Sequence, residues 1–336
     1  MPEALPARAV WFEGPRRAAL REHEVLPPGP GEVRVESLYS GISSGTEMLV
    51  YRGEVSPRLD LDLPTLEGSF ALPVKYGYAV VGRVLDVGEG TGGLRRDDIV
   101  FVHHPHQSVF CVPVGLPVRL PEGLDPLLGI FAANLETALN VIHDTPLLLG
   151  ETAVVFGQGV VGMMIAQLLR LAGAGRVVTV EPREKRRALS LSIGADAALA
   201  PGEDILKSCG RRPDVAVEVS GVGEALQQAI DSVADEGTVV AVSWYGTKPV
   251  ILQLGGRFHR GRVRIRSSQV GRIGPEASPR WDRRRRMEVV LDLLGRLHLQ
   301  EFVTHRFHLE DAPAAYRLLD GGAEDVVQAV FVYEGG

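Results

Sequence analysis

Glycines at a G-x-G-x-x-G spacing stand between two apolar stretches, Ala153–Phe156 and Val160–Ala172. If the first stretch is a strand and the second a helix, the first glycine permits a tight turn and the second lets the backbone approach a diphosphate. The third lets the helix pack closely on the strand, and the N–H groups at the start of the helix bind the phosphates. The pattern therefore predicts a dinucleotide-binding loop. Its candidate cofactor-binding residues are Gly157, Gly159, Val160, Val161 and Gly162.

An acidic residue, Glu181, lies about 20 residues beyond the last of these glycines and directly follows the apolar run Val177–Val180. A carboxylate at this place accepts hydrogen bonds from the ribose hydroxyls of NAD and repels the 2′-phosphate of NADP. We therefore expect NAD as the cofactor. Arg186 follows shortly afterwards, and its positive charge keeps NADP as an alternative. The competing interpretation is a glycine turn in an α/β protein that binds no nucleotide.

Three histidines, His103, His104 and His106, follow the apolar run Ile99–Val102. Hydride transfer from a nicotinamide to a carbonyl places negative charge on oxygen, which a nearby proton donor stabilises. Histidine suits this task because it titrates near neutral pH. We take His106 as the first candidate and His104 as the second, against the alternative that both are ordinary loop residues. A metal site is disfavoured, because no carboxylate or thiol lies close to the histidines in the sequence.

The elements that would position these residues differ between the two parts of the chain. Residues 7–130 are rich in proline and glycine and contain short β-like runs, which indicates a mostly antiparallel β domain. From Thr152 onward, strand-like runs alternate with helical stretches, which indicates right-handed βαβ units and a parallel sheet. The expected strands are Ala153–Phe156, Val177–Val180, Val215–Val219, Thr238–Ser243 and Val263–Ser267. The expected helices are Val160–Ala172, Arg183–Ile193 and Gly223–Val233.

The C-terminal part is expected to contain a helix near Asp282–Leu294 and a final strand over Val326–Val332. The helix begins with four arginines, Arg283–Arg286, whose charge opposes the helix dipole and is offset in part by Asp282 as the N-cap. Such a run is typical of a solvated helix face paired with surface carboxylates. The alternative is a patch that holds an acidic substrate or the diphosphate of the cofactor.

Composition limits the classes of protein to which the chain can belong. Its 336 residues suggest two domains, and a hydrophobic fraction of 45% is sufficient to bury their cores. A net charge of −6 argues against a nucleic-acid partner. Two cysteines are too few for a disulfide framework. Neither a membrane-spanning apolar run nor the pattern of a secretory signal is present, so we expect no membrane partner and a cytoplasmic location.

Two segments resemble the metal-ligand segments of the medium-chain dehydrogenases and reductases: residues 40–47, SGISSGTE, and residues 77–82, GYAVVG. The chain is similar to this superfamily, which includes zinc alcohol dehydrogenases and quinone oxidoreductases, over nearly its whole length. The resemblance implies an α/β fold with a GroES-like β-rich catalytic domain formed by residues 1–128 and 272–336. It also implies a doubly wound Rossmann domain over residues 129–271 and an active site between the two domains.

The resemblance places the three zinc ligands of the family on Ser44, Tyr78 and Ala133. A catalytic zinc needs three protein ligands drawn from Cys, His, Asp or Glu, and none of these three residues supplies one. We therefore expect no zinc. Tyr78 then becomes another candidate proton donor, since a phenol with a pKa near 10 suits donation to an alkoxide. Alternatively, it only fills the volume left by the metal. Ser44 and Thr46 would orient the substrate.

The resemblance also assigns residues around the nicotinamide. Thr137 is expected beside the ring, and backbone groups after two strands of the parallel sheet would hold the carboxamide. These strand-end residues are Ser220, Val242, Ser243 and Trp244. Trp244 can equally be wall packing. By family habit, the chain is expected to form a homodimer or a homotetramer.

Together these observations predict a zinc-independent, NAD(P)(H)-dependent oxidoreductase that acts on a small molecule. Hydride would move between the nicotinamide and an alcohol or ketone, or a conjugated enone. The Ser-Gly-Thr-Glu segment also resembles, locally, that of the bacteriochlorophyllide dehydrogenases, which oxidise a hydroxyethyl side chain. One alternative is a nucleotide-binding sensor or scaffold without turnover. Another is a quinone oxidoreductase-like reductase that relies mainly on the positioning of its cofactor.

Overall fold

The computed structural model describes residues 3–61, 63, 65–66, 68–323 and 325–336, and the chain divides into two compact units. The first unit, which we call the β-rich unit, comprises the residues up to Ala133 together with Leu299–Gly336. The second, the parallel-sheet unit, comprises Asn134–His298. The sequence analysis places the boundaries at 128/129 and 271/272. Among the described residues, no helix combines the length and the apolar composition that crossing a bilayer requires.

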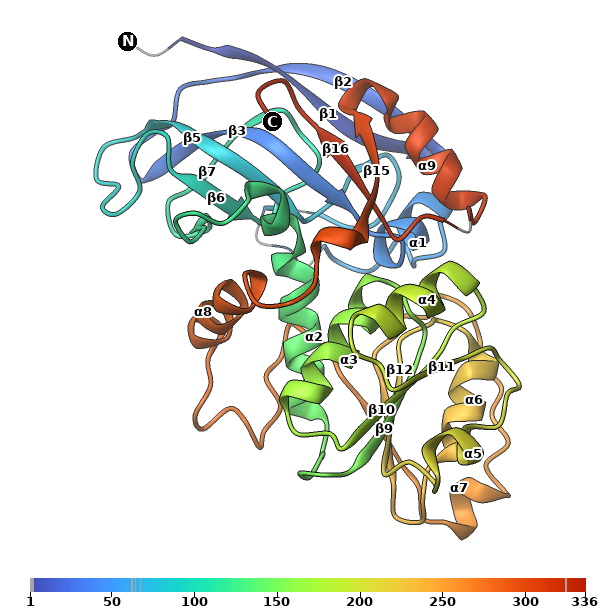
Figure 1. Ribbon diagram of the computed structural model, residues 1–336. Helices are drawn as coiled ribbons and strands as arrows, with labels where there is room; N and C mark the ends of the chain where they lie inside the picture. Colours follow the sequence, from blue (N-terminus) through green and yellow to red (C-terminus); the bar gives the residue numbers. More distant parts are fainter. Residues whose placement is uncertain (1–2, 62, 64, 67, 324) are drawn as a thin grey trace. The chain divides into compact units, whose positions relative to one another are not determined.

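The β-rich unit contains a seven-stranded sheet in the order β15-β16-β3-β5-β6-β8, with β7 paired to β3, and a three-stranded sheet in the order β2-β1-β4 (Figure 1). The predicted C-terminal strand is confirmed as β16, which pairs antiparallel with β3 so that Ala329 faces Ile42. The strands are β1 Leu5–Gly14, β2 Arg17–Val25, β3 Glu32–Ile42, β4 Val74–Lys75, β5 Val80–Val87, β6 Ile99–Val102, β7 Val109–Pro113, β8 Val118–Arg119, β15 Val303–His308 and β16 Gln328–Val332. The α-helices and 3-10 helices of this unit are α1 Thr46–Arg52, η1 Pro126–Phe131, η2 Gln300–Phe302, η3 Leu309–Asp311 and α9 Ala312–Asp320.

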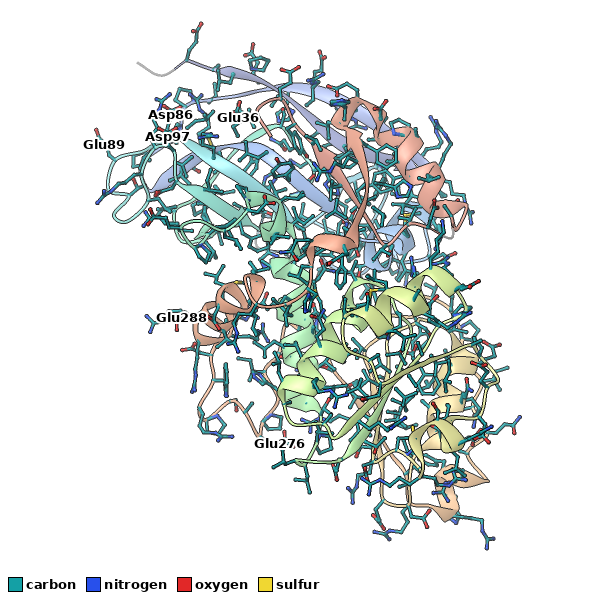
Figure 2. The ribbon with its side chains drawn as sticks, in the orientation of Figure 1. Glu36, Asp86, Glu89, Asp97, Glu276 and Glu288 are labelled. Carbon is teal, nitrogen blue, oxygen red and sulfur yellow. The ribbon has the colours of Figure 1, made fainter. Side chains whose placement is uncertain are left out.

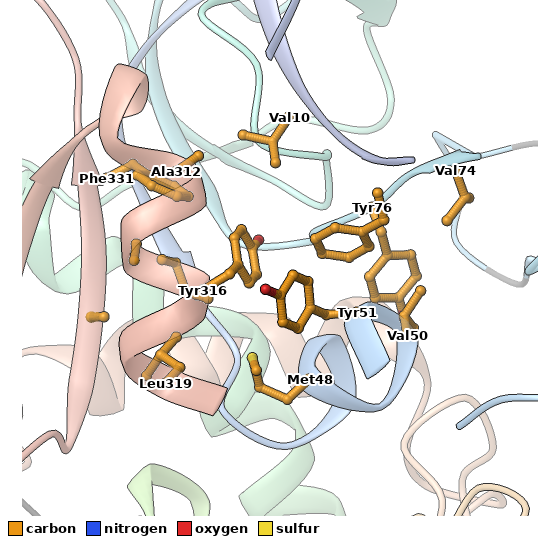
Figure 3. Packing of buried hydrophobic residues seen from close by; sticks show 14 of the residues in the cluster. Val10, Met48, Val50, Tyr51, Val74, Tyr76, Ala312, Tyr316, Leu319 and Phe331 are labelled. Carbon is orange, nitrogen blue, oxygen red and sulfur yellow. The ribbon is translucent and has the colours of Figure 1, made fainter. Parts of the chain in front are cut away.

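Aromatic rings pack helices α1 and α9 into the core of the β-rich unit (Figure 3). The rings of Tyr51 and Tyr316 are stacked with their centroids 5.2 Å apart, and Phe12 meets Tyr316 edge to face at 4.9 Å. Helix α1 ends at Gly53, which adopts φ 74° and donates its N–H to the carbonyls of the last turn. Because α1 is buried over residues 47–51, its polar residues must find partners inside the unit.

The parallel-sheet unit contains six parallel strands in the order β11-β10-β9-β12-β13-β14 (Figure 1). In sequence order this is 3-2-1-4-5-6, the arrangement of the doubly wound dinucleotide-binding sheet. The predicted α/β class and the five predicted strands are confirmed. The strands are β9 Thr152–Phe156, β10 Arg176–Val180, β11 Ala197–Leu199, β12 Val215–Glu218, β13 Thr238–Ala241 and β14 Arg264–Ser267. The helices are α2 Ala132–Asp144, α3 Val160–Leu171, α4 Glu184–Ser192, α5 Ile205–Cys209, α6 Gly223–Ser232, α7 Arg257–Arg260 and α8 Arg283–Leu294.

The arginine run at the start of α8 is not one uniform face. Asp282 caps the helix as predicted, accepting the backbone N–H of Arg285 at 2.7 Å. Arg284 is exposed and lies 3.5 Å from Glu288, which is labelled in Figure 2. Arg286, by contrast, is only 2% exposed and forms an ion pair with Glu136 at 2.7 Å. The prediction of a solvated face is therefore wrong for Arg286, because this side chain enters the unit and bonds to α2.

Candidate active site

The glycine loop has the geometry that the sequence predicts. Gly157 has φ +97°, and a Cβ there would lie 2.8 Å from the backbone of Ser220. A Cβ on Gly162 would overlap the carbonyl oxygen of Gly157. Gly159 differs, because a Cβ there would have only the guanidinium of Arg186 within 4 Å. The glycine at this N-cap of α3 therefore leaves open space where a diphosphate would approach the helix. Val160 and Val161 form the first turn of α3 behind it.

Glu181 and Arg186 lie together beside this loop. The Glu181 carboxylate accepts the backbone N–H of Gln158 at 2.8 Å and that of Arg183 at 3.1 Å, and it is 4% exposed. Arg186 is buried in turn. Burial and the charge of Arg183 lower its pKa, and the charge of Glu181 raises it. Together the three effects lower the pKa to about 10. The structure thus places an acceptor for ribose hydroxyls and a guanidinium at the same loop.

The carboxyl ends of β12 and β13 bring together the strand-end residues that the sequence analysis assigns to the nicotinamide. Their organiser is Glu218, which has no exposed surface and which sequence reasoning missed. One Glu218 oxygen accepts the N–H and the hydroxyl of Ser220, each at 2.7 Å, and the other accepts the hydroxyl of Tyr245 at 2.7 Å. The Ser243 hydroxyl accepts the N–H of Gly221 at 2.8 Å. The sequence signal that could have identified Glu218 is an acidic residue near the end of the apolar run Val215–Val219.

The remaining residues assigned to the cofactor lie in the same unit. Val242 donates its N–H to the carbonyl of Glu218 at 2.9 Å, which fixes the backbone just after β13. Trp244 is 39% exposed, and Thr137 is half-buried on α2. In a doubly wound sheet, ligands bind outside the carboxyl ends of the strands. The glycine loop and the strand-end residues occupy that edge of the sheet.

The β-rich unit contains a fully buried hydrogen bond between the side chains of His106 and Glu47. The His106 Nε2 lies 2.9 Å from Glu47 Oε2, and neither side chain has any exposed surface. The other ring nitrogen, Nδ1, lies 2.7 Å from the Ser40 hydroxyl. Glu47 accepts two more hydrogen bonds, from the backbone N–H of Ser43 at 2.9 Å and from the Tyr316 hydroxyl at 2.9 Å. Both ring nitrogens of His106 are thus engaged inside the protein.

Tyr78 lies next to this pair. The phenol is half-buried, and the side chains of Ser43 and Thr46, at the start of α1, are close enough to its hydroxyl to lower its pKa. Burial raises the pKa of Tyr78 to about 12, and the negative charge of Glu47 adds to the shift. The phenol therefore keeps its proton at neutral pH. Ser44, which lies between Ser43 and Thr46 in the sequence, is exposed.

His104 has a different environment from His106. Its ring stacks on Phe110 with the centroids 3.7 Å apart, and its Nδ1 lies 2.9 Å from the carbonyl oxygen of Pro105. Burial lowers the pKa of His104 to about 3, so the imidazole is neutral throughout the ordinary pH range. Its described hydrogen bond links it to the backbone rather than to Tyr78 or to Glu47.

The donor set at the three positions of the family's zinc ligands does not fit a catalytic zinc. Ser44 offers a hydroxyl, Tyr78 a phenol with a raised pKa, and Ala133 a buried methyl group. Zinc is bound in proteins by thiolate, imidazole and carboxylate groups. Over the part of the chain that the structure describes, no three such side chains gather in a way that could hold a metal ion.

Comparison with known proteins agrees with this fold. Residues 160–285 match the family model described as zinc-binding dehydrogenase. The D-guloside 3-dehydrogenase of Escherichia coli K12 is 26% identical over 326 residues, covering 90% of this chain and 93% of the relative. The (R,R)-butanediol dehydrogenase of Bacillus subtilis is 28% identical over 282 residues, covering 73% and 78%.

Solved structures have the same fold over nearly the entire chain. The 2R,3R-butanediol dehydrogenase of Bacillus subtilis superposes with a TM-score of 0.80 at 22% identity, covering 97% of this chain and 99% of that one. A putative zinc-binding dehydrogenase of Sinorhizobium meliloti 1021, bound to NADP, gives 0.79 at 20% identity, covering 98% and 99%. The predicted α/β fold, with a β-rich domain and a doubly wound parallel-sheet domain, is thereby confirmed.

Proposed function

We propose, from the premise that this chain is an NAD(P)-dependent dehydrogenase of the medium-chain type, that it transfers hydride without zinc and uses Tyr78 as its proton donor. The substrate would be an alcohol or ketone, or a conjugated enone. The observation that carries the proposal is the half-buried Tyr78 phenol, which is close enough to the Ser43 and Thr46 side chains and to the buried carboxylate of Glu47 for all three to act on its pKa. A phenol thus stands where the family has its zinc histidine.

The chemistry of this arrangement suits carbonyl reduction. A bound nicotinamide supplies or accepts the hydride. Negative charge then grows on the substrate oxygen, and a positioned O–H donor stabilises it and supplies the proton. Tyr78 is protonated at neutral pH because its pKa is about 12. Thr46 orients the phenol and the substrate, and Ser44 offers a further exposed hydroxyl.

We revise the order of the candidate donors on this ground. His106 is the first candidate by sequence, but its side chain has no exposed surface and both of its ring nitrogens are engaged. His104 is stacked on Phe110, and its low pKa leaves it without a proton to donate as an imidazolium. We therefore rank Tyr78 as the first candidate proton donor and His106 after it.

The experiment that tests this proposal compares wild type with the Tyr78→Phe variant in NADH oxidation against ketones, enones and quinones. We expect kcat to fall by about 100-fold or more, as is typical on loss of a general acid, with the Kd of NADH unchanged. If the kcat for quinone reduction is the same in wild type and Tyr78→Phe, the quinone oxidoreductase-like alternative is favoured. Tight NADH binding without turnover of any substrate would favour a sensor.

Zinc independence is tested separately, by metal analysis of the purified protein. We expect turnover that survives prolonged dialysis against a chelator, because the three positions lack thiolate, imidazole and carboxylate donors. A stoichiometric zinc content together with loss of activity on chelation would overturn this part of the proposal. Homologous dehydrogenases that retain zinc provide the positive control for the chelation step.

We propose NAD as the preferred cofactor, with NADP as the weaker one. Glu181 supports this because its carboxylate lies at the glycine loop, where it repels a 2′-phosphate. We expect Glu181→Gln to lower the Kd ratio of NADPH to NADH by about 10-fold, measured by quenching of tryptophan fluorescence. Glu184→Gln removes the same charge from an exposed position in the first turn of α4 and is the matched control. If the Kd ratio of NADPH to NADH is unchanged in Glu181→Gln, Glu181 does not select NAD over NADP.

A further inference from the structure

We propose that the β-rich unit binds a phosphate group, free or carried by a small molecule, in a cavity between the β1–β2 hairpin and helices α1 and α9. The cavity has a volume of about 190 Å³, and its lining includes Glu13, Arg16, Arg17, Tyr51, Pro313 and Arg317. All of these residues belong to the β-rich unit, whereas the glycine loop belongs to the parallel-sheet unit. The inference therefore does not depend on the proposed function.

The carboxylates at this cavity are already paired with guanidinium groups. Glu13 is the acidic residue of the lining, and Arg21 donates two hydrogen bonds to it, at 2.8 and 2.9 Å. Arg16 is paired as well, since its Nε lies 2.9 Å from Asp320. Asp320 also binds the Nε of Arg52 at 2.6 Å. One carboxylate thus serves two guanidinium groups, which leaves positive charge uncompensated beside the cavity.

Arg17 and Arg317 add two further positive charges. Both residues are exposed and line the cavity, and among the described contacts neither side chain forms an ion pair or a hydrogen bond. Five guanidinium groups therefore gather around two carboxylates, in a chain whose net charge is −6. Like charges held together repel one another, and a bound anion relieves that repulsion.

Tyr51, which is labelled in Figure 3, holds the hairpin turn in place. Arg16 lies in this turn with φ +57°, in the left-handed region that residues other than glycine rarely adopt. Both of its backbone groups bond to Tyr51. The Arg16 N–H donates to the Tyr51 carbonyl at 2.6 Å, and the Arg16 carbonyl accepts the Tyr51 hydroxyl at 3.0 Å. The turn is thus fixed before a ligand arrives, which lowers the entropy cost of binding.

The guanidinium groups converge on the Tyr51 phenol from three elements. Burial and the charge of Asp320 raise the pKa of Tyr51, and the charges of Arg317, Arg16 and Arg52 oppose this rise. These three arginines lie on α9, in the hairpin turn and at the end of α1. The positive charge is therefore concentrated at the cavity that Tyr51 lines, rather than spread over the surface.

The chemistry of the lining favours a doubly charged oxyanion. The planar guanidinium group binds phosphate oxygens through two parallel N–H groups. A phosphate group carries about −1.5 to −2 charges at pH 7, which matches the two charges of Arg17 and Arg317. The cavity holds about six waters at ~30 Å³ each, and pockets for drug-sized ligands begin at about 300 Å³. The site therefore accommodates a phosphate group and a few waters rather than a whole nucleotide.

A bound phosphate would link distant parts of the chain. Arg17 begins β2, and Arg317 lies on α9 near the C-terminal end. An anion that bonds both would join the hairpin to α9 and stabilise the β-rich unit by mass action. Thermal unfolding therefore gives a readout of the site that needs no enzymatic turnover.

The test titrates the full chain with inorganic phosphate by calorimetry, at a constant ionic strength adjusted with KCl. Arg17→Gln and Arg317→Gln each remove one guanidinium group and keep a polar side chain. We expect each to weaken binding by about 10-fold or more, because a hydrogen bond between charged partners is lost. Phosphate should also raise the Tm of wild type more than that of either variant. The glycine loop is unchanged in both variants, so any phosphate bound there contributes equally to all titrations.

The matched control is Arg58→Gln, since Arg58 is an exposed arginine of the same unit and is not one of the described residues that line the cavity. We expect its Kd for phosphate to equal that of wild type. An equally large loss in this control would reduce the effect to net charge and contradict the site. Equal Kd values in wild type and the two site variants would also overturn it, as would the absence of phosphate binding to wild type. A parallel titration with glycerol phosphate distinguishes a phosphate monoester from free phosphate, according to which binds more tightly.

Discussion

Two histidines that stand two positions apart illustrate what decides function at the scale of the residue. His106 is held between a carboxylate and a hydroxyl, whereas His104 is stacked on Phe110 and bonded to a backbone carbonyl. The residue type alone predicts that either imidazole can move a proton. The partners, which come from β3, α1 and β7, decide that His106 links a buried carboxylate to a buried hydroxyl, whereas His104 does not.

The low pKa of His104 leads to a prediction about stability. Its folded-state pKa of about 3 lies below the unfolded value of 6.5, so the unfolded state binds the extra proton. This contribution to stability is fully present above about pH 6.5 and is lost at about 1.4 kcal/mol per pH unit as the pH falls towards 3. Urea unfolding between pH 7.5 and 5 should therefore show a steeper loss for wild type than for His104→Phe, which keeps the stacking but cannot titrate. Equal slopes would contradict the assignment.

The Tyr78 site shows which part of the candidate site could be predicted from sequence. The resemblance to a metal-ligand segment locates Ser44, Thr46 and Tyr78 in the chain, but only the fold shows that Thr46 lies close to Tyr78 while Ser44 is exposed. The contact between Ser40 and Tyr333 could not be predicted, because the two residues lie on β3 and after β16, almost 300 residues apart in sequence. Contacts at that separation depend on strand pairing and leave no local pattern.

At the scale of the element, α8 shows how tertiary structure overrides a charge pattern. A run of four arginines predicts a solvated face, yet the helical turn directs Arg286 towards α2. There its guanidinium bonds Glu136, the Asn140 side chain at 2.6 Å and the carbonyl of Val270 at 2.8 Å. Helix α3 was predictable because a long apolar stretch follows the glycine loop, and β9 because it is a short continuous apolar run that ends at that loop. Strand β11 and the helices α5 and α7 were missed because elements of three to five residues are too short to show a periodic pattern.

The position of Arg286 leads to a second stability prediction. Replacing Arg286 by Leu leaves the buried carboxylate of Glu136 without this guanidinium, so we expect a loss of about 3 kcal/mol in the free energy of unfolding. Arg284→Leu, two residues earlier and exposed, should change it by about 0.5 kcal/mol or less. Urea denaturation of the two variants measures the difference. Equal, small effects would show that Arg286 does not anchor α8.

At the scale of the whole molecule, the chain returns to its first unit after completing its second. Strands β15 and β16 join the sheet that β3 and β5 began, and β16 carries the chain to Tyr333, whose hydroxyl lies 2.8 Å from that of Ser40 on β3. The change from short β-like runs to alternating strands and helices near residue 150 predicted the order of the two domains, whereas the return was implied by the resemblance to the medium-chain dehydrogenases. The sequence analysis placed the second boundary earlier than the contacts do.

We also propose that the chain self-associates through β14. This strand forms the edge of the six-stranded sheet, and among the described residues no further strand pairs with its outer side. Alternation along the strand turns the N–H of Ile265 outward, since those of Arg264 and Ser268 bond β13. Open edges of this kind pair readily with a second chain. Light scattering should give a mass of at least twice 36.3 kDa for wild type, and Ile265→Pro, which removes that N–H, should lower it.

Gly77 links the backbone to the buried imidazole in a way that constrains how this family of sequences can change. It adopts φ +124°, and a methyl group at its Cα would lie 2.8 Å from the His106 ring. A larger residue at 77 would be strained by this backbone conformation and would collide with the ring that Glu47 and Ser40 hold in place. In related sequences we therefore expect glycine at 77 wherever histidine stands at 106.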